Sequence, residues 1–367
     1  MQTVEHQELD QMTRDVFADM ERSASLTAAR GAEPLALVRS AWQSLAAVGL
    51  LGVGLPQPLG GSGASMRDVA VIAESAGGTA IPGPYIGSLV GEALLAHCAA
   101  EPVLSQLGHH IATGELVVVP AWETFSHEIV PTRRDDALRL NGSHVSGALC
   151  AVPFGDQADA VLAFAHDAEA GVKRLCLLFV DAPHIERSAA PAAFDPIEPV
   201  ASLSLDGAAA QVLRHVTSPF DHVRSIFAAE LIGTGQRALD AVIDYAGVRR
   251  QFGRPIGSFQ VIKHALADRF VDIGAARLLA QDAADCVDSA NENQELQTRS
   301  ALAAAQAASE AIVSQSIQFH GGLGFTWEHP AHLHLKHVRA RRTLLGRPAH
   351  HLDAISRLLL AQTSTSV

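Results

Sequence analysis

Two adjacent arginines, followed by a glycine- and proline-rich turn, form the segment of this chain with the clearest chemical potential. Residues 245–260 read Tyr-Ala-Gly-Val-Arg-Arg-Gln-Phe-Gly-Arg-Pro-Ile-Gly-Ser-Phe-Gln, so that Arg249 and Arg250 stand directly before the turn. Guanidinium groups bind phosphate oxygens through paired hydrogen bonds. The segment therefore predicts an anion site suited to a pyrophosphate. The alternative is that the arginines are solvated charges that stabilise a helix end.

A second segment combines a glutamine with a pair of glycines. Gln318 lies near the end of a helical pattern, and Gly321 and Gly322 follow it. Glycine allows backbone conformations and close approaches that a side chain would prevent. This segment therefore predicts a surface that a flat ligand can approach.

Together the two segments resemble the flavin-binding signature of the acyl-CoA dehydrogenase family, most strongly over residues 220–350. The resemblance implies that flavin adenine dinucleotide (FAD) lies across a subunit interface and that the arginine turn of one chain meets the cofactor of its neighbour. It also implies that the glutamine and glycine pair contact the adenosine end. The cofactor-binding residues implied in this way are Arg249, Gln251, Phe252, Gln260, Gln318, Gly321 and Gly322.

The segment Phe-Asp-His-Val-Arg, residues 220–224, resembles the family's substrate entrance. The resemblance implies that Asp221 and Arg224 position the thioester substrate. The two residues are three apart on one helix face, so a structural ion pair is the alternative.

The reaction of the family removes an α-proton with a glutamate and passes the β-hydride to the flavin. Family members place this glutamate just before the arginine of the entrance segment, where this chain has Val223, or in a stretch that here reads Arg-Thr-Leu-Leu-Gly-Arg-Pro, residues 342–348. Neither place holds a carboxylate, so both customary bases are missing.

Glu230 is the candidate replacement for the base. It follows Val223 by seven residues, so both side chains project from nearly the same helix face. Its neighbours are apolar, which predicts a buried carboxylate with a raised pKa, as a base near neutrality requires. The alternative is a glutamate that pairs with an arginine of a neighbouring helix.

Two other patterns suggest chemistry and are better explained by structure. Gly233 and Gly235 fit a dinucleotide fingerprint, but they lie inside a helical pattern with no preceding strand, so close helix packing is the expected role. The histidines between residues 329 and 337 have spacings that place them on different helix faces, which argues against a metal site. They are expected to form a basic helix that faces cofactor or coenzyme phosphates.

The middle of the chain departs from the family pattern. Residues 121–126 and 151–155 stand where family members carry contacts to the flavin ring, and neither has the usual order of residues. These departures resemble divergent members that act on steroid side chains, often as heteromeric pairs.

The positioning elements follow from composition and periodicity. The chain has 367 residues, is 48% hydrophobic and is only 5% aromatic, which favours several domains and closely packed helices. Helical patterns give way to short apolar runs near residue 115 and return near residue 220. The predicted fold is α+β, with an N-terminal helical domain (1–115), a central β-barrel-like domain (116–219) and a C-terminal four-helix bundle (220–367).

Local signals refine this plan. A long helix is expected to start near Asp221 and to end at the arginine pair, and Ser258 is expected to cap the next helix. Asn141-Gly142 and Asp206-Gly207 predict turns.

Charge and composition exclude several classes of function. The formal charge of −12 argues against a nucleic-acid partner. The four cysteines form no CxxC pair, the polar N-terminal residues do not resemble a signal peptide, and no apolar run is long enough to cross a membrane, which together predict a cytoplasmic protein.

The resemblance therefore implies an FAD-dependent acyl-CoA dehydrogenase that desaturates an acyl-CoA thioester, including thioesters of steroid side chains. It implies electron-transfer flavoprotein or a similar protein as electron acceptor, and a homo- or hetero-oligomer built of dimers. The alternative is a non-catalytic subunit of a heteromeric dehydrogenase, which completes the FAD site of its neighbour without a base of its own.

Overall fold

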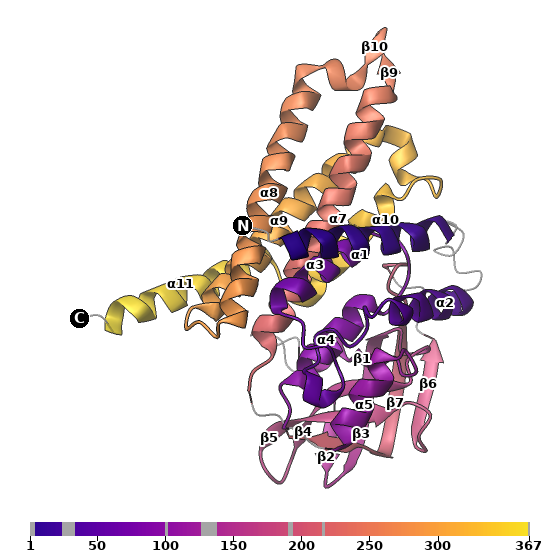
Figure 1. Cartoon of the computed structure of the whole chain (residues 1–367), viewed down its shortest axis with the longest axis vertical. Coiled ribbons are helices and arrows are strands. Elements are labelled where there is room, and N and C mark those ends of the chain that lie inside the picture. The colour runs from indigo at the N-terminus through magenta and orange to yellow at the C-terminus, as the bar shows by residue number, and fades with distance from the viewer. Residues whose placement is uncertain are drawn as a thin grey trace. The chain divides into compact units, whose positions relative to one another are not determined.

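The computed structural model describes residues 4–23, 34–99, 102–125, 138–189, 194–214 and 217–365. The described elements follow the predicted order of helices, strands and helices (Figure 1). The chain divides into two compact units, and each unit combines segments that are far apart in the sequence. The domain boundaries at residues 115 and 219 stay a sequence-based prediction.

The unit formed by residues 28–65 and 82–223 contains the β-sheet. Its strands are ordered β6-β7-β3-β2-β4-β5-β8, and β1 pairs with β4. The pairs β1–β4 and β2–β4 are parallel, whereas the other pairs are antiparallel. The strands are β1 (Val118–Pro120), β2 (Leu138–Asn141), β3 (His144–Pro153), β4 (Ala160–Asp167), β5 (Val172–Phe179), β6 (Ile185–Ala189), β7 (Val200–Ala209) and β8 (Gln211–Leu213).

Helices of the same unit are α2 (Pro34–Ala47), α4 (Tyr85–Ala96) and α5 (Pro102–Ala112), with short 3-10 turns η2 (Gln57–Leu59) and η3 (Trp122–Thr124). A buried carboxylate ties the loop after α2 to α4. Glu92 accepts hydrogen bonds from the N–H groups of Gly52 and Gly54, at 3.0 and 2.9 Å, and from the Ser88 hydroxyl. Burial raises the pKa of Glu92 to about 7, and these three donors oppose that rise.

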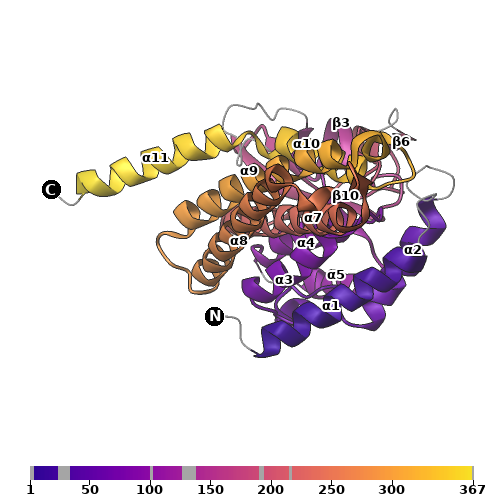
Figure 2. The ribbon, with the colours of Figure 1, turned by 90° about the horizontal axis from the view of Figure 1, so that it is seen from above.

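The second unit combines residues 1–27, 66–81 and 224–367 and is helical. α8 lies along α9, and both Figure 1 and Figure 2 show the two helices side by side. Its elements are α1 (Val4–Ser23), α3 (Met66–Gly77), α7 (Phe220–Val248), β9 (Arg250–Gln251), β10 (Arg254–Pro255), η4 (Ile256–Ser258), α8 (Gln260–Asp288), α9 (Gln294–His320), η5 (Gly321–Phe325), α10 (Ala331–Leu345) and α11 (Pro348–Thr365).

Glycines bring α3 and α7 into close contact. A Cβ atom at Gly77 would lie 2.1 Å from the carbonyl oxygen of Glu230, and one at Gly233 would lie 1.9 Å from that of Glu74. The Thr234 hydroxyl donates a 2.8 Å hydrogen bond to the Gly77 carbonyl across the same contact. The helical position and packing role expected for Gly233 are therefore confirmed.

Two local predictions are wrong. Ser258 does not cap α8, because its hydroxyl donates to the carbonyl of Pro255 within η4 and Phe259 occupies the N-cap position. Asp206-Gly207 forms no turn between strands but lies inside β7, opposite Ser146 at a register shift between β3 and β7. Gly207 has a φ of +67° there, so the dipeptide signals a β-bulge, which needs the same backbone freedom as a turn.

Candidate functional site

The arginine turn forms a tight hairpin at the end of α7. β9 and β10 pair through Gln251 and Arg254, and Phe252 at the hairpin has a φ of +51°. Positive φ is uncommon for a bulky residue, and the Phe252 ring is 91% exposed. The hairpin therefore holds an aromatic side chain in the solvent, as a ligand or partner surface would require.

Several polar side chains around this hairpin have no partner within the described part of the chain. The side chains of Arg249, Gln251 and Gln260 are exposed, and none of the three makes a hydrogen bond or an ion pair with another described residue. In contrast, Arg250 donates to the Gly253 carbonyl at 3.3 Å, and Arg254 lies over the Phe259 ring at 4.1 Å. Arg249 is therefore the guanidinium of this turn that is available to an anionic ligand.

The glutamine and glycine segment lies beside the end of α7. α9 ends at His320, whose ring lies 4.6 Å from the Tyr245 ring, four residues before Arg249. Gly321 has a φ of +61°, and a Cβ atom at Gly321 or Gly322 would meet nothing within 4 Å. The structure thus brings the two segments that predict FAD binding to the same end of the helical unit.

The chemistry of these residues fits one part of an FAD site. Arg249 could supply a charge-assisted donor for a phosphate. The side-chain amides of Gln251, Gln260 and Gln318, which have no partner among the described residues, could supply neutral donors and acceptors. The open backbone at Gly321 and Gly322 leaves room for a flat ring system.

Asp221 and Arg224, the predicted substrate residues, are both buried. Arg224 donates from Nε to the Thr298 hydroxyl at 3.1 Å, which fixes its side chain against α9. This contact accounts for the position of the Arg224 guanidinium, and the substrate role of both residues stays a prediction.

Glu230 lies at the centre of a buried ion-pair network. Its side chain is 1% exposed, and its carboxylate accepts hydrogen bonds from Arg341 Nε at 2.8 Å and Nη2 at 2.7 Å. His337 Nε2 lies 2.9 Å from the same carboxylate, and Phe227 packs its ring 5.3 Å from the Arg341 guanidinium carbon. These contacts join α7 to α10.

The two places where family members carry a base are occupied by buried apolar or backbone groups. Val223 and Leu345 are fully buried, and the Gly346 carbonyl accepts a 3.0 Å hydrogen bond from Gln306. No carboxylate is present at either place, as the sequence indicates.

The two segments that depart from the family pattern lie together in the sheet-containing unit. Glu123 in η3 accepts hydrogen bonds from the N–H groups of Cys150 and Ala151 on β3, at 2.6 and 3.3 Å. Trp122 packs edge-on against Phe125, with 5.7 Å between ring centroids. Ser126, the last residue of the first segment, lies outside the described residues.

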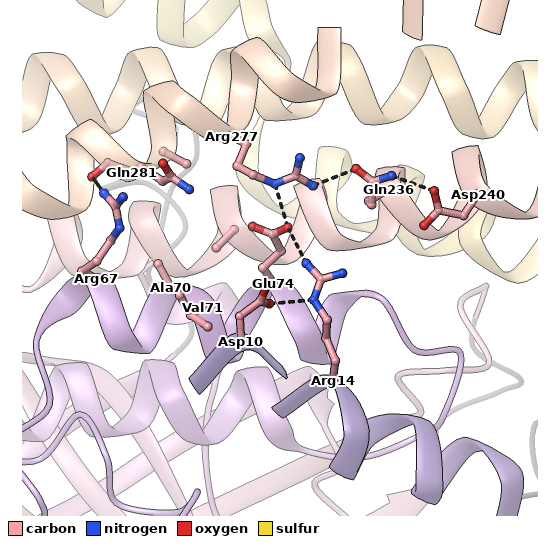
Figure 3. A pocket seen from close by; sticks show the side chains of 12 residues that line it. Asp10, Arg14, Arg67, Ala70, Val71, Glu74, Gln236, Asp240, Arg277 and Gln281 are labelled. Atoms are coloured by element: carbon pink, nitrogen blue, oxygen red, sulfur yellow. Dashed lines mark hydrogen bonds and ion pairs between the residues drawn. The ribbon is translucent and has the colours of Figure 1, made fainter. Parts of the chain in front are cut away.

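A polar cavity of about 220 Å³ lies between α1, α3, α7 and α8, and none of the predicted site residues lines it. Figure 3 shows that its charged side chains point toward one another. Arg277 donates to Glu74 at 2.9 Å and to Gln236 at 2.8 Å, and Arg14 pairs with Asp10 at 2.7 Å. Because these side chains pair with one another, the lining of the cavity forms an ion-pair network with a structural role.

Comparison with known proteins identifies the family. The acyl-CoA dehydrogenase N-terminal domain matches residues 3–115, and the acyl-CoA dehydrogenase C-terminal domain matches residues 213–360. The chain belongs to the acyl-CoA dehydrogenase family. The family normally binds FAD and acts on acyl-CoA substrates.

Individual relatives agree with this assignment. The chain is 32% identical over 321 residues to acyl-CoA dehydrogenase IpdE2 of Mycobacterium tuberculosis, which covers 84% of this chain and 83% of that protein. A solved structure of a variant of the Tcur3481-Tcur3483 steroid ACAD has 25% identity and a TM-score of 0.85, over 98% of this chain and 99% of that chain. The ChsE4-ChsE5 complex from Mycobacterium tuberculosis shares the fold, with a TM-score of 0.84 and 22% identity over 98% of each chain.

In this member of the acyl-CoA dehydrogenase family, the prediction that Glu230 has a raised pKa is wrong. Burial would raise the pKa, but the charges and hydrogen bonds of Arg341 and His337 outweigh it and lower the pKa to about 2. The geometry supports the alternative of a carboxylate paired with an arginine of a neighbouring helix. The missed partners carried a signal in the sequence, because His337 and Arg341 are four apart and so share a helix face.

The basic character expected for the histidines between residues 329 and 337 is also wrong for two of them, His329 and His334. Burial and nearby positive charge lower the pKa of His334 to about 3, and burial with neighbouring imidazoles lowers that of His329 to about 4. Both imidazoles are therefore neutral at physiological pH. Among the described residues no group of three or more side chains is placed to hold a metal ion, and no helix could span a membrane.

The buried histidines predict a loss of stability in acid. A histidine with a lowered folded pKa stabilises the fold fully above its unfolded pKa of 6.5, and this stability is lost as the pH falls toward the folded value. For His334 we expect about 2 kcal/mol less unfolding free energy at pH 5 than above pH 6.5. Urea titrations of the wild type and His334→Gln at both pH values measure this difference. The unfolding free energy of the His334→Gln variant should depend less on pH than that of the wild type. The variant His144→Gln, at an exposed position, should show the same pH dependence as the wild type. An equal pH dependence in all three proteins would contradict the prediction.

Proposed function

We propose that this chain is one subunit of an FAD-dependent acyl-CoA dehydrogenase and that a different subunit supplies the catalytic base. The observation that carries the proposal is the state of the three candidate base positions. Position 223 and the Leu345–Gly346 stretch hold no carboxylate. The negative charge of Glu230 is already paired with Arg341 and His337. A carboxylate with a pKa of about 2 is a weak proton acceptor near neutrality.

The hairpin after α7 and the start of η5 support FAD binding. Arg249 would bind the pyrophosphate, and Gln251 with Phe252 would contact the cofactor from the hairpin. Gln260, Gln318, Gly321 and Gly322 would hold the remaining parts of the dinucleotide. The bound flavin supplies the hydride acceptor for oxidation of the Cα–Cβ bond.

The substrate side of the proposal rests on the start of α7. Asp221 and Arg224 would position the thioester, and the burial of both side chains would exclude water from this region. Burial strengthens electrostatic interactions with a bound ligand because the local dielectric constant is low.

Relatives favour a CoA ester of a steroid side chain as the substrate. The structure with 25% identity is described as a steroid ACAD, and another relative of the same fold was solved as a complex of two different chains. We propose the same substrate class, a heteromeric assembly and electron-transfer flavoprotein or a similar protein as acceptor.

The visible spectrum of the purified chain tests this function. A heteromeric subunit should be colourless or retain little flavin alone, and should become yellow and be bleached by an acyl-CoA after a second, base-carrying subunit is added. The heteromeric proposal would be overturned if the chain alone is yellow and is bleached by an acyl-CoA as fast as it is in the presence of the second subunit. That result would support a homomeric enzyme.

A further inference from the structure

Three aromatic rings lie against one another where the two segments of the candidate FAD site meet. The ring centroid of His320, the last residue of α9, is 4.6 Å from that of Tyr245 on α7 and 4.1 Å from that of His329. His329 stands just before α10, and the central residue, His320, is only 3% exposed. We call these three residues the ring stack. It joins the ends of two helices to the start of a third.

The two imidazoles of the ring stack can lie close together because they are uncharged at physiological pH. Burial lowers the pKa of His320, and burial together with the neighbouring imidazoles lowers that of His329 to about 4. His320 Nδ1 donates a 2.8 Å hydrogen bond to the Ser316 carbonyl, and His329 Nδ1 accepts a 3.2 Å hydrogen bond from the Ala331 N–H. These bonds fix the orientation of both rings.

Gly321 and Gly322 have no side chains that could hold their own backbone in place. A Cβ atom at either residue would meet nothing within 4 Å. Gly321 has a φ of +61° and a ψ of −137°, a backbone conformation that residues with a side chain rarely adopt. His320 directly precedes this pair, so the orientation of its ring sets the direction in which the chain enters the glycines.

Tyr245, at the other side of the ring stack, supports the end of α7. The Arg249 N–H donates a 2.8 Å hydrogen bond to the Tyr245 carbonyl, so one helical turn separates the two residues. A displacement of Tyr245 therefore displaces the backbone of Arg249. The Arg249 side chain makes no hydrogen bond or ion pair with another described residue, so its position depends on this backbone.

We infer that His320 is a positioning residue that sets the distance between Arg249 and the glycine pair and so determines how tightly the chain holds FAD. It acts through the ring stack, because its buried ring contacts Tyr245 and His329. The inference rests on the proposed function, in which both segments bind FAD. It adds a residue that neither contacts the cofactor nor belongs to the two predicted segments' binding groups.

Two substitutions at position 320 separate the ring from the rest of the side chain. His320→Ala removes the ring and should raise the FAD dissociation constant of the assembly at least about tenfold. His320→Phe keeps a flat ring that can pack between Tyr245 and His329, and should return the dissociation constant to within about threefold of the wild-type value. FAD titration of the flavin-free assembly, followed by flavin fluorescence, measures both constants.

Variants at two other positions distinguish positioning from general stability. Tyr245→Leu removes the outer ring of the stack at a half-buried position and should also weaken FAD binding. Ile312→Ala is the matched control, because it truncates a fully buried side chain of the same helix about two turns before His320. It should lower the unfolding free energy measured by urea titration and leave the FAD affinity close to that of the wild type.

Hydrogen–deuterium exchange of the chain alone provides a measurement that needs neither flavin nor another subunit. The amides of residues 245–256 and 321–329 should exchange faster in His320→Ala than in the wild type, and His320→Phe should slow them again. A wild-type assembly that binds no FAD would contradict the proposed function, whereas the exchange rates would still decide whether the ring stack holds the two segments. An FAD affinity in His320→Ala equal to that of the wild type, or a His320→Phe variant no better than His320→Ala, would overturn the positioning role.

Discussion

Glu230→Gln should destabilise the protein strongly and leave the bleaching of bound flavin by an acyl-CoA close to its original rate. The substitution keeps the shape of the side chain but removes the charge that Arg341 and His337 share. An uncompensated buried charge costs about 3–5 kcal/mol. Urea titration measures the stability, and stopped-flow absorbance of the flavin-loaded assembly measures the rate.

Glu310→Gln is the matched control, since it makes the same change in a helix of the same unit. Glu310 pairs with Arg339 at 3.4 Å, and the Arg339 side chain is exposed. A surface ion pair contributes at most about 1 kcal/mol to stability. The unfolding free energy and the bleaching rate of this variant should therefore remain close to those of the wild type. If Glu230→Gln instead stays stable and loses bleaching by a factor of about a hundred or more, as loss of a general base would cause, Glu230 is the base and the heteromeric proposal fails.

Arg249→Ala should weaken FAD binding by about tenfold to 150-fold. This range corresponds to a charge-assisted hydrogen bond worth about 1.5–3 kcal/mol. Arg249 is expected to show the effect because its guanidinium has no partner within the described chain. FAD titration of the flavin-free assembly, followed by flavin fluorescence, measures the dissociation constant.

Arg254→Ala removes an equal charge from the same hairpin and provides the comparison. The Arg254 guanidinium already lies over the Phe259 ring, 4.1 Å from its centre. We expect its loss to weaken FAD binding by much less. Equal weakening in the two variants would show a general charge effect, and unchanged FAD affinity in Arg249→Ala would remove that residue from the site.

The sequence by itself determined the features that depend on local periodicity and on short motifs. The order of helices, strands and helices was predictable because apolar spacing changes near residues 115 and 220. The end of α7 before the arginine turn was predictable because Gly253 and Pro255, which follow the arginine pair, are residues that interrupt a helix. The packing role of Gly233 was predictable for a similar reason, since no strand precedes it.

Only the tertiary structure decided the state of Glu230. Apolar neighbours along the chain indicated burial correctly, but the pKa of a buried carboxylate depends on charges that distant residues bring to it. Arg341 comes from a helix 111 residues away in sequence and reverses the direction of the shift. His334 shows the converse, because it was expected to belong to a basic helix, whereas burial and nearby positive charge keep its imidazole neutral. Periodicity fixes which face of a helix a side chain occupies, whereas the charges that meet on that face are decided by the packing of helices far apart in the chain.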